Sequence, residues 1–141
     1  EARELGAEAV LLIVRALPDP LLRELLNLTH QCGMEALVET HSAAEVERAL
    51  AAGARIVGVN NRDLDTLTTD VSLAPRLRAR VPATCVFVAE SGIARPADVA
   101  VLRDAGVDAV LVGESLLRAE DPGAKLRTLV AAGTPHAGRV S

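Results

Sequence analysis

The chain has 141 residues, half of them apolar, and a mean hydropathy of +0.27, which suits one domain with a sizeable core. A net charge of −4 and a single aromatic residue, Phe87, argue against nucleic-acid partners and against binding to anionic membranes. The longest apolar run, Ala9–Val14, is too short to span a bilayer and follows no basic signal-peptide segment. Cys32 and Cys85 are expected to be buried free thiols of a cytoplasmic protein.

The first residues, Glu1 to Gly6, are typical of the last turn of a helix that ends at a glycine. Because a domain rarely starts at such a point, we expect the sequence to open within a larger fold. The same succession of glycine, turn and apolar strand recurs at Gly53 and Gly106. This internal repeat indicates one repeated architecture.

Five apolar runs are predicted to be strands, and their starts are separated by roughly 20 to 30 residues, the length of one β-loop-α-loop unit. Each run is continuously apolar, as expected of parallel strands that are buried on both faces. The predicted strands are Ala9–Val14, Ala36–Val38, Ile56–Val59, Cys85–Ala89 and Ala109–Val112.

Helix signals fill the gaps between these strands. Asp19 is a predicted N-cap, Ser42 and Glu45 form a predicted capping box, and Glu114 to Arg118 could begin a short extra helix. The other predicted helices are one that ends at Gly33, one over Leu73–Arg80, one from Arg95-Pro96 to Gly106 and one from Asp121-Pro122 to Ala131. We expect residues 1–132 to form the domain and residues 133–141 to be a disordered tail.

An α/β chain of this kind forms either a closed barrel or an open doubly wound sheet. Neither GxGxxG nor GxxxxGK[ST] follows any strand, so the usual nucleotide-binding motifs are missing. Polar residues instead follow four successive strands, whereas an open sheet would concentrate them at one switch point. They are Glu39, Asn60, Glu90-Ser91 and Gly113-Glu114. This favours a (β/α)8 TIM barrel, here a partial barrel of about five βα units.

Two of these strand ends carry candidate catalytic and binding groups. Glu39 ends a buried strand, where a carboxylate is costly unless it is paired or functional, and burial would suit it to proton transfer. The alternative is that Glu39 emerges into solvent. His41 is interpreted as a loop residue rather than a base. Asn60 and Arg62 can bind a substrate carboxylate or phosphate, or they can belong to a turn with a surface ion pair.

The last two strand ends suggest a phosphate site. At Gly92 and Gly113 no Cβ obstructs the approach of an anion to backbone N–H groups. The short helix expected from Glu114 would place its N-terminus beside the same anion. Loops after the seventh and eighth strands usually form the phosphate site of such barrels. Two ordinary glycine turns would explain either segment alone but explain the pair poorly.

At these residues the chain resembles the indole-3-glycerol phosphate synthase family. The resemblance covers nearly everything except the tail and makes the five predicted strands barrel strands four to eight. The segments that carry it are LLIVRAL (Leu11–Leu17), ALVETH (Ala36–His41), GVNNRDL (Gly58–Leu64), VAESGI (Val88–Ile93) and DAVLVGESLLRAEDPG (Asp108–Gly123).

The resemblance implies closure of an indole ring on a small phosphorylated substrate, with loss of carbon dioxide and water and with no metal or organic cofactor. It implies that Glu114 contributes its backbone N–H, since a carboxylate facing phosphate would be repulsive. The implied roles are catalytic for Glu39 and Asn60, substrate-binding for Arg62, Glu90 and Ser91, and phosphate-binding for Gly92, Gly113 and Glu114.

The family's catalytic lysines, on strands one and three, have no counterpart here, because the only lysine is Lys125 in the last predicted helix. We therefore expect the isolated chain to be inactive, marginally stable at its two uncovered strands, and dependent on a missing N-terminal barrel half as partner. Three alternatives stay open: another phosphate-binding barrel such as a phosphoribosyl isomerase or thiazole synthase, a non-catalytic barrel, and an open-sheet binding domain.

Overall fold

The computed structural model describes residues 1–63 and 65–134, which form a single five-stranded sheet. The strands are β1 (Ala9–Ile13), β2 (Glu35–Thr40), β3 (Ile56–Asn60), β4 (Val86–Glu90) and β5 (Ala109–Leu111). The α-helices are α1 (Asp19–Gln31), α2 (Ala43–Ala52), α3 (Leu73–Leu77), α4 (Pro96–Asp104), α5 (Glu114–Leu117) and α6 (Pro122–Gly133). Two short 3-10 helices are η1 (Val14–Ala16) and η2 (Arg78–Arg80).

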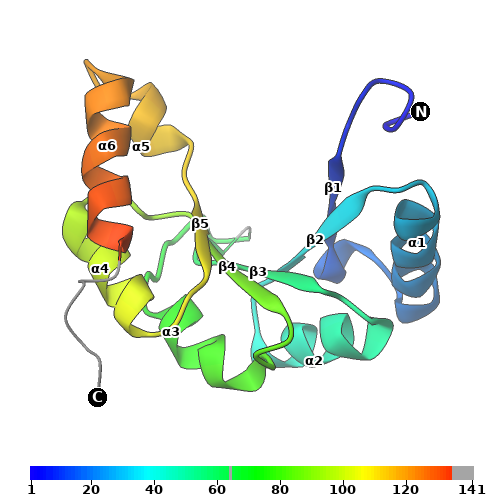
Figure 1. The fold of residues 1–141 in the computed structure, drawn as a ribbon. Coiled ribbons are helices and arrows are strands. Elements are labelled where there is room, and N and C mark those ends of the chain that lie inside the picture. The colour runs from blue at the N-terminus through cyan, green and yellow to red at the C-terminus, as the bar shows by residue number, and fades with distance from the viewer. Residues whose placement is uncertain (64, 135–141) are drawn as a thin grey trace.

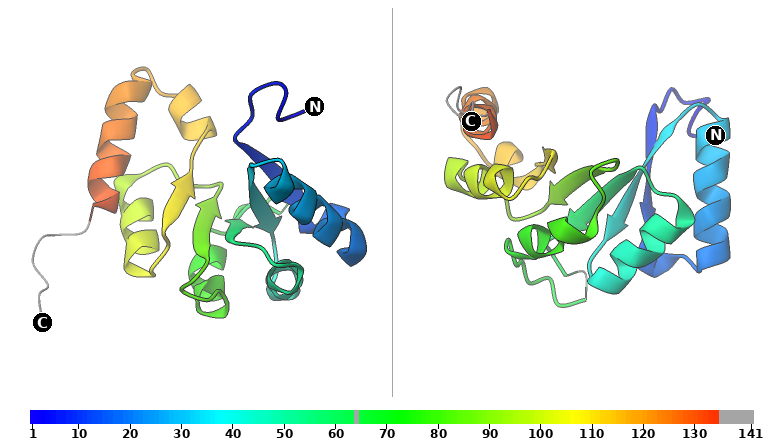
Figure 2. Two further views of the ribbon diagram at one scale, coloured as in Figure 1. Left: turned by 45° about the vertical axis from the view of Figure 1, so that its right-hand side comes forward. Right: turned by 60° about the horizontal axis from the view of Figure 1, so that its bottom comes forward.

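All neighbouring strands pair in parallel, and their order in the sheet is their order in the chain. A doubly wound sheet reverses its strand order at a switch point, whereas a barrel keeps it. The sheet curves, with α1 to α4 along its convex side and the concave side open (Figure 1, Figure 2). The predicted partial (β/α)8 barrel of five βα units is confirmed.

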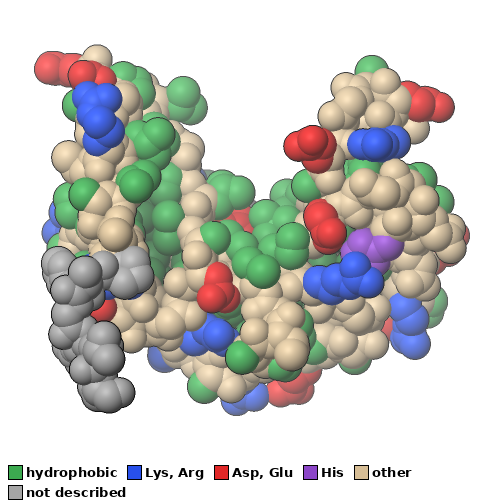
Figure 3. Space-filling view, viewed as in Figure 1, with side chains coloured by type: hydrophobic (Ala, Val, Ile, Leu, Met, Phe, Trp, Pro, Cys, Tyr) green, Lys and Arg blue, Asp and Glu red, His purple; other side chains and the backbone are tan. Residues whose placement is uncertain are grey.

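The concave side is visibly hollowed. In the space-filling view a gap separates the arm that carries α5 and α6 from the arm that carries β1, and hydrophobic side chains lie in it (Figure 3). The side chains of Leu11 and Leu111, on the two edge strands, are each 50% exposed. The prediction of strands buried on both faces is therefore right for the central strands and wrong for β1 and β5, which have a neighbour on one side only.

The glycine repeat has a common hydrogen-bond geometry. At Gly6, Gly33, Gly53 and Gly106 the backbone φ is positive, and the glycine N–H donates to the carbonyl three residues earlier. The next N–H donates to the carbonyl five residues earlier, which is the Schellman pattern that ends a helix. The repeat predicted from Gly6, Gly53 and Gly106 is confirmed, and Gly33 adds a fourth copy. Residues 2–6 themselves form a turn rather than a helix.

The helix starts differ in detail from their prediction. The N-cap of α1 is Pro18, and Asp19 is the first helical residue, whose carboxylate accepts a hydrogen bond from Arg48 Nε at 2.6 Å. In α2 half of the predicted capping box is present: the Ser42 hydroxyl accepts from the Glu45 N–H, whereas the Glu45 carboxylate accepts from the His41 N–H rather than from Ser42. The short helix expected from Glu114 is present as α5.

Both cysteines were predicted to be buried free thiols. Cys32, at the C-cap of α1, is exposed rather than buried, because it follows the last turn of a surface helix. Cys85 is half-buried, and both are free thiols.

The helix α6 extends to Gly133, and the tail predicted for residues 133–141 otherwise falls almost wholly outside the described residues. Within the described part of the chain, no helix has the length and apolarity needed to cross a membrane.

Candidate functional site

The polar residues predicted at the strand ends meet at one rim of the sheet. Strand register pairs Glu39 with Gly58, and Asn60 with Glu90, so that β2, β3 and β4 end at the same edge. Glu39, Asn60 and Glu90 are each at most 8% exposed. The alternative that Glu39 emerges into solvent is therefore wrong, and two carboxyl groups and an amide are buried together.

Glu39 and Glu90 form a pair of interacting carboxyl groups. Burial raises the pKa of Glu90 to about 7, and the charge of Glu39 adds to this effect. Space for the Glu90 carboxyl group comes from Gly58 on β3, where an added Cβ would lie 2.0 Å from Glu90 Oε1. Glu90 Oε1 is buried and has no hydrogen-bond partner among the described residues. A pair of this kind can exchange a proton near neutral pH.

A histidine contacts the outer side of this pair. His41 Nε2 lies 3.3 Å from Glu39 Oε1, and the His41 side chain is only 3% exposed. The sequence placed His41 in a loop, which is correct for its backbone. Its burial against Glu39 was missed.

The two asparagines at the end of β3, Asn60 and Asn61, have different partners. Asn60 Oδ1 accepts the Arg62 N–H at 3.0 Å, so its oxygen belongs to the predicted turn and its NH₂ group is what it can offer a ligand. Asn61 is 2% exposed; its Nδ2 donates to the Ser91 carbonyl and its Oδ1 accepts the Ala74 N–H, both at 3.1 Å. Asn61 therefore fixes the ends of β3 and β4 relative to each other, a role that the sequence did not reveal.

The β5 end of the rim contains an exposed ion-pair cluster. Arg62 Nη2 donates to Glu114 Oε2 at 2.7 Å, and Arg118 Nη2 lies 3.1 Å from Glu114 Oε1. The hydrogen bond from Arg62 is the main cause that lowers the pKa of Glu114. The surface ion pair considered for Arg62 is thus present. The carboxylate of Glu114 balances the two guanidinium groups that a bound anion would contact.

A cavity of about 430 Å³ opens beside this cluster. It brings together five of the predicted site residues, from the segments that follow β3, β4 and β5. The cavity is lined by Arg62, Ser91, Gly92, Ile93, Ala94, Leu111, Val112, Gly113, Glu114, Ser115 and Arg118. The other three predicted site residues, Glu39, Asn60 and Glu90, are not part of this lining, although Glu90 directly precedes Ser91 in the chain.

The two predicted phosphate glycines differ in their surroundings. Gly92 has a φ of +74°, and a Cβ there would lie 2.5 Å from Thr69 Cγ2 and 2.8 Å from Val71 Cγ1. A Cβ on Gly113 would meet no atom within 4 Å. The fold itself thus requires glycine at 92, whereas Gly113 leaves open space on the cavity wall. Ser91 also has a positive φ of 65°, a strained conformation for a residue with a Cβ.

The described residues of the rim include no metal-binding cluster and no lysine. Among residues 1–63 and 65–134, no group of three or more His, Cys, Asp or Glu side chains could hold a metal ion. The single lysine, Lys125, is in α6, outside the set of residues that line the cavity. The ionisable groups of the described rim are therefore carboxyl groups, guanidinium groups and the imidazole of His41.

Comparison with known proteins identifies the family. Residues 1–129 match the family model described as indole-3-glycerol phosphate synthase. The chain is 50% identical over 130 residues to an indole-3-glycerol phosphate synthase of Dehalococcoides mccartyi, and 55% identical over 130 residues to indole-3-glycerol phosphate synthase 2 of Streptomyces coelicolor. Each alignment covers 92% of this chain and 50% of the relative. The chain spans about half the length of these curated relatives.

Solved structures agree on the fold. The 3-hexulose-6-phosphate synthase of Salmonella typhimurium aligns with a TM-score of 0.78 at 18% identity, over 93% of this chain and 64% of that one. The BexX/CysO complex of Amycolatopsis orientalis aligns with a TM-score of 0.69 at 21% identity, over 94% of this chain and 56% of that one. At such identities the likeness concerns the fold alone. The sequence match over residues 1–129 goes further: the chain belongs to the indole-3-glycerol phosphate synthase family.

Proposed function

We propose that the protein carrying this chain is a lyase of tryptophan biosynthesis that closes an indole ring. Its substrate would be 1-(2-carboxyphenylamino)-1-deoxyribulose 5-phosphate, converted with loss of carbon dioxide and water to indole-3-glycerol phosphate. The observation that carries the proposal is a buried carboxyl pair whose Glu90 directly precedes Ser91 in the wall of an arginine-lined cavity, in a chain of this family.

The carboxyl pair would handle protons during ring closure and dehydration. Glu39 and Glu90 are buried side by side, and the raised pKa of Glu90 means that the pair can hold one proton at neutral pH. Glu39 would transfer the proton, Glu90 would share it and orient the substrate, and the Asn60 NH₂ group would hydrogen-bond a substrate oxygen. General acid–base catalysis by a positioned carboxyl group contributes about 10²- to 10⁴-fold to rate.

The cavity would hold the anionic groups of the substrate. Arg62 can donate paired hydrogen bonds to a carboxylate or phosphate, after its bond to Glu114 is exchanged for one to the ligand. Ser91 and Gly92 line the same wall, and Gly113 leaves room for close approach to the backbone. Glu114 would act through its backbone N–H and hold Arg62 in the free enzyme. No metal or organic cofactor enters this scheme.

The test is the rate of ring closure by the full-length protein, followed by the fluorescence of the indole product. We expect turnover by the wild type and a kcat reduced about 10²- to 10⁴-fold by Glu39→Gln. Glu47→Gln is the matched control, because Glu47 is an exposed glutamate on α2 that pairs only with Arg80 in the described chain. A folded wild-type protein without turnover, or equal rates for both variants, would contradict the proposal.

We further propose that an N-terminal barrel half completes this site. Leu11 and Leu111 are exposed on the edge strands, and the relatives are about twice as long as this chain. The missing half would cover these strands and supply the ammonium groups that Lys125 cannot. The isolated 141 residues should therefore be inactive, and co-expression with the upstream half should restore turnover. Full activity of the isolated chain would refute this proposal.

A further inference from the structure

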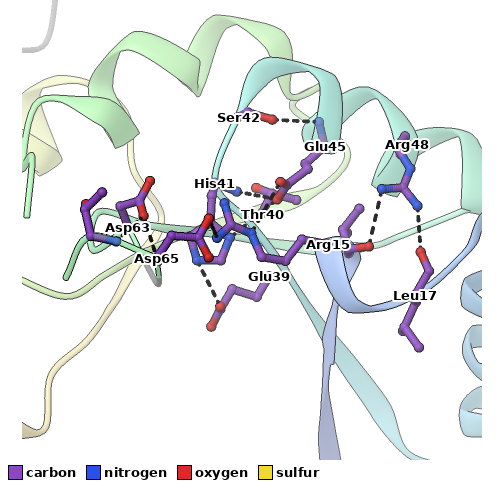
Figure 4. A network of polar contacts seen from close by, with 12 residues as sticks. Arg15, Leu17, Glu39, Thr40, His41, Ser42, Glu45, Arg48, Asp63 and Asp65 are labelled. Carbon is purple, nitrogen blue, oxygen red and sulfur yellow. Dashed lines mark hydrogen bonds and ion pairs between the residues drawn. The ribbon is translucent and has the colours of Figure 1, made fainter. Parts of the chain in front are cut away.

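The buried imidazole of His41 lies between two carboxylates. Its Nε2 is 3.3 Å from Glu39 Oε1, and its Nδ1 is 3.4 Å from Glu45 Oε2. The side chains of Glu39 and Glu45 are 6% and 13% exposed, so the three groups are largely shielded from water. The close-up shows His41 between the end of β2 and the first turn of α2 (Figure 4).

Each ring nitrogen of His41 lies within 3.5 Å of a carboxylate oxygen, close enough for a hydrogen bond after a small rotation of the ring. A neutral imidazole carries one N–H and can donate to one carboxylate only, whereas an imidazolium donates to both. Buried carboxylates require such partners. Neither ring nitrogen of His41 makes a hydrogen bond among the described residues, so both are close to a carboxylate and still free to donate to it. The imidazole is therefore available to link Glu39 with Glu45.

The carboxylate of Glu45, on the other side of His41, has further partners. Glu45 Oε2 accepts the His41 N–H at 2.8 Å, and the Glu45 N–H is bonded to the Ser42 hydroxyl. Arg15, which follows β1, places its Nε 3.8 Å from Glu45 Oε1 and its Nη1 3.2 Å from Asp65 Oδ2. Glu45 is thus fixed by its own helix start and by a cation from the neighbouring strand end. The imidazole that packs against it has a defined position.

We propose that His41 is a positioning residue for Glu39. Its imidazole ties the Glu39 carboxylate to the anchored Glu45 and thereby fixes the direction in which Glu39 faces the substrate. The proposal rests on the proposed function, in which Glu39 transfers a proton. The charged groups that surround the link are Glu39 on β2, Glu45 on α2, Arg15 after β1, Asp65 after β3 and, facing Glu39, Glu90 on β4.

The experiment measures kcat and KM of the full-length protein. For His41→Ala we expect kcat to fall about 10- to 100-fold, because small misplacements of a catalytic group have effects of this size, with KM changed less than about threefold. His41→Gln keeps an N–H donor and should recover part of kcat. In a Glu39→Gln background, His41→Ala should lower the remaining rate by less than about threefold, because a residue that acts through Glu39 has nothing left to position.

His30→Ala is the matched control. His30 is the other described histidine, at the end of α1, where its Nε2 lies 4.0 Å from Glu35 Oε2. Its replacement should leave kcat unchanged. Glu45→Gln provides a second route if His41→Ala does not fold, since it weakens the anchor and should lower kcat but not raise KM. Thermal unfolding verifies that each variant is folded.

The experiment distinguishes failure of the positioning role of His41 from failure of the proposed function. Turnover by the wild type with kcat unaffected by His41→Ala or by Glu45→Gln overturns the positioning role and leaves the proposed function standing. Fully additive losses in the double variant, or a change confined to KM, also overturn it. Absence of turnover in the wild type would instead defeat the proposed function itself.

Discussion

The two ends of the candidate site are built from opposite physical environments. At the β2 to β4 end, Glu39 and Glu90 are each 5% exposed and lie against Gly58. At the β5 end, Arg62 and Glu114 have side chains that are 40% and 54% exposed, and they border an open cavity. The carboxyl groups at the first end are shielded from water, whereas the ion pair at the second end is in contact with water.

In the proposed function, this difference would separate two tasks along one rim. Burial moves the titration of a carboxyl pair toward neutral pH, so that the pair can gain or lose a proton there, as acid–base chemistry requires. Exposure keeps an ion pair weak, commonly below about 1 kcal/mol, so that an incoming anion can replace the carboxylate of Glu114 on Arg62. Proton transfer and anion binding can thus be altered independently by substitutions at the two ends.

The largest effect on stability is expected where the two ends meet, at Gly92. Gly92→Ala should lower the free energy of unfolding by about 2–4 kcal/mol, because the left-handed backbone disfavours alanine and the new Cβ overlaps Thr69 and Val71. Gly113→Ala is the matched variant, with a φ of −121° and no atom near the new Cβ. It should change stability by less than about 0.5 kcal/mol.

Urea unfolding of the full-length protein measures both values. The affinity for inorganic phosphate, measured by calorimetry, should fall in Gly113→Ala, because the added methyl group narrows the approach to the backbone. Equal stability losses at the two glycines would remove the distinction between a glycine required by packing and one that leaves room for a ligand.

The next effect concerns the exposed end alone. Arg62→Ala should weaken substrate binding about 10- to 100-fold, since a hydrogen bond to a charged group is worth about 1.5–3 kcal/mol. Glu114→Gln should strengthen binding or leave it unchanged, because the competing carboxylate is removed. The measurement is KM, with product affinity by calorimetry as a second value.

Arg80→Ala is the control for charge alone. Arg80 is 51% exposed and pairs with Glu47, and it is not among the residues that line the cavity. Binding reduced equally by Arg62→Ala and Arg80→Ala would indicate a general effect of net charge and would contradict a contact between Arg62 and the ligand.

Much of the fold could be predicted from the sequence because its signals are local. Gly6, Gly53 and Gly106 and the residues that follow them form hydrogen bonds that reach at most five residues back, so a short segment contains the whole pattern. Strand ends were predicted for the same reason: apolar runs stop at polar residues such as Glu39 and Asn60. Parallel pairing then brings these ends to one rim.

The contacts within the site could not be predicted in this way, because they join residues far apart in the chain. Asn61 bonds to the Ser91 carbonyl, 30 residues later, and Gly58 makes room for Glu90 through strand register. The pairing of Arg62 with Glu114 depends on β3 and β5 reaching the same rim. The contact between His41 and Glu45 is an exception, because the two residues are only four positions apart. A His-x-x-x-Glu spacing across the start of a helix could have predicted it.

The smallest effect tests the buried end through pH. The pKa of Glu90 is raised to about 7 in the folded state against an ordinary value of 4.5, so folding takes up a proton between these values. The stability that this proton confers is fully present below about pH 4.5 and is lost as pH rises to about 7. Glu90→Gln removes this titration and should flatten the dependence of the unfolding free energy on pH.

The difference in unfolding free energy between the wild type and Glu90→Gln should change by on the order of 1–2 kcal/mol between pH 5 and pH 8, because burial favours the protonated form of Glu90 in the folded state only. Urea unfolding at a series of pH values measures it, with the exposed Glu47→Gln as the control that should run parallel to the wild type. A Glu90→Gln curve parallel to the wild type would mean that the carboxyl end is no more shielded from water than the arginine end, and the contrast between them would disappear.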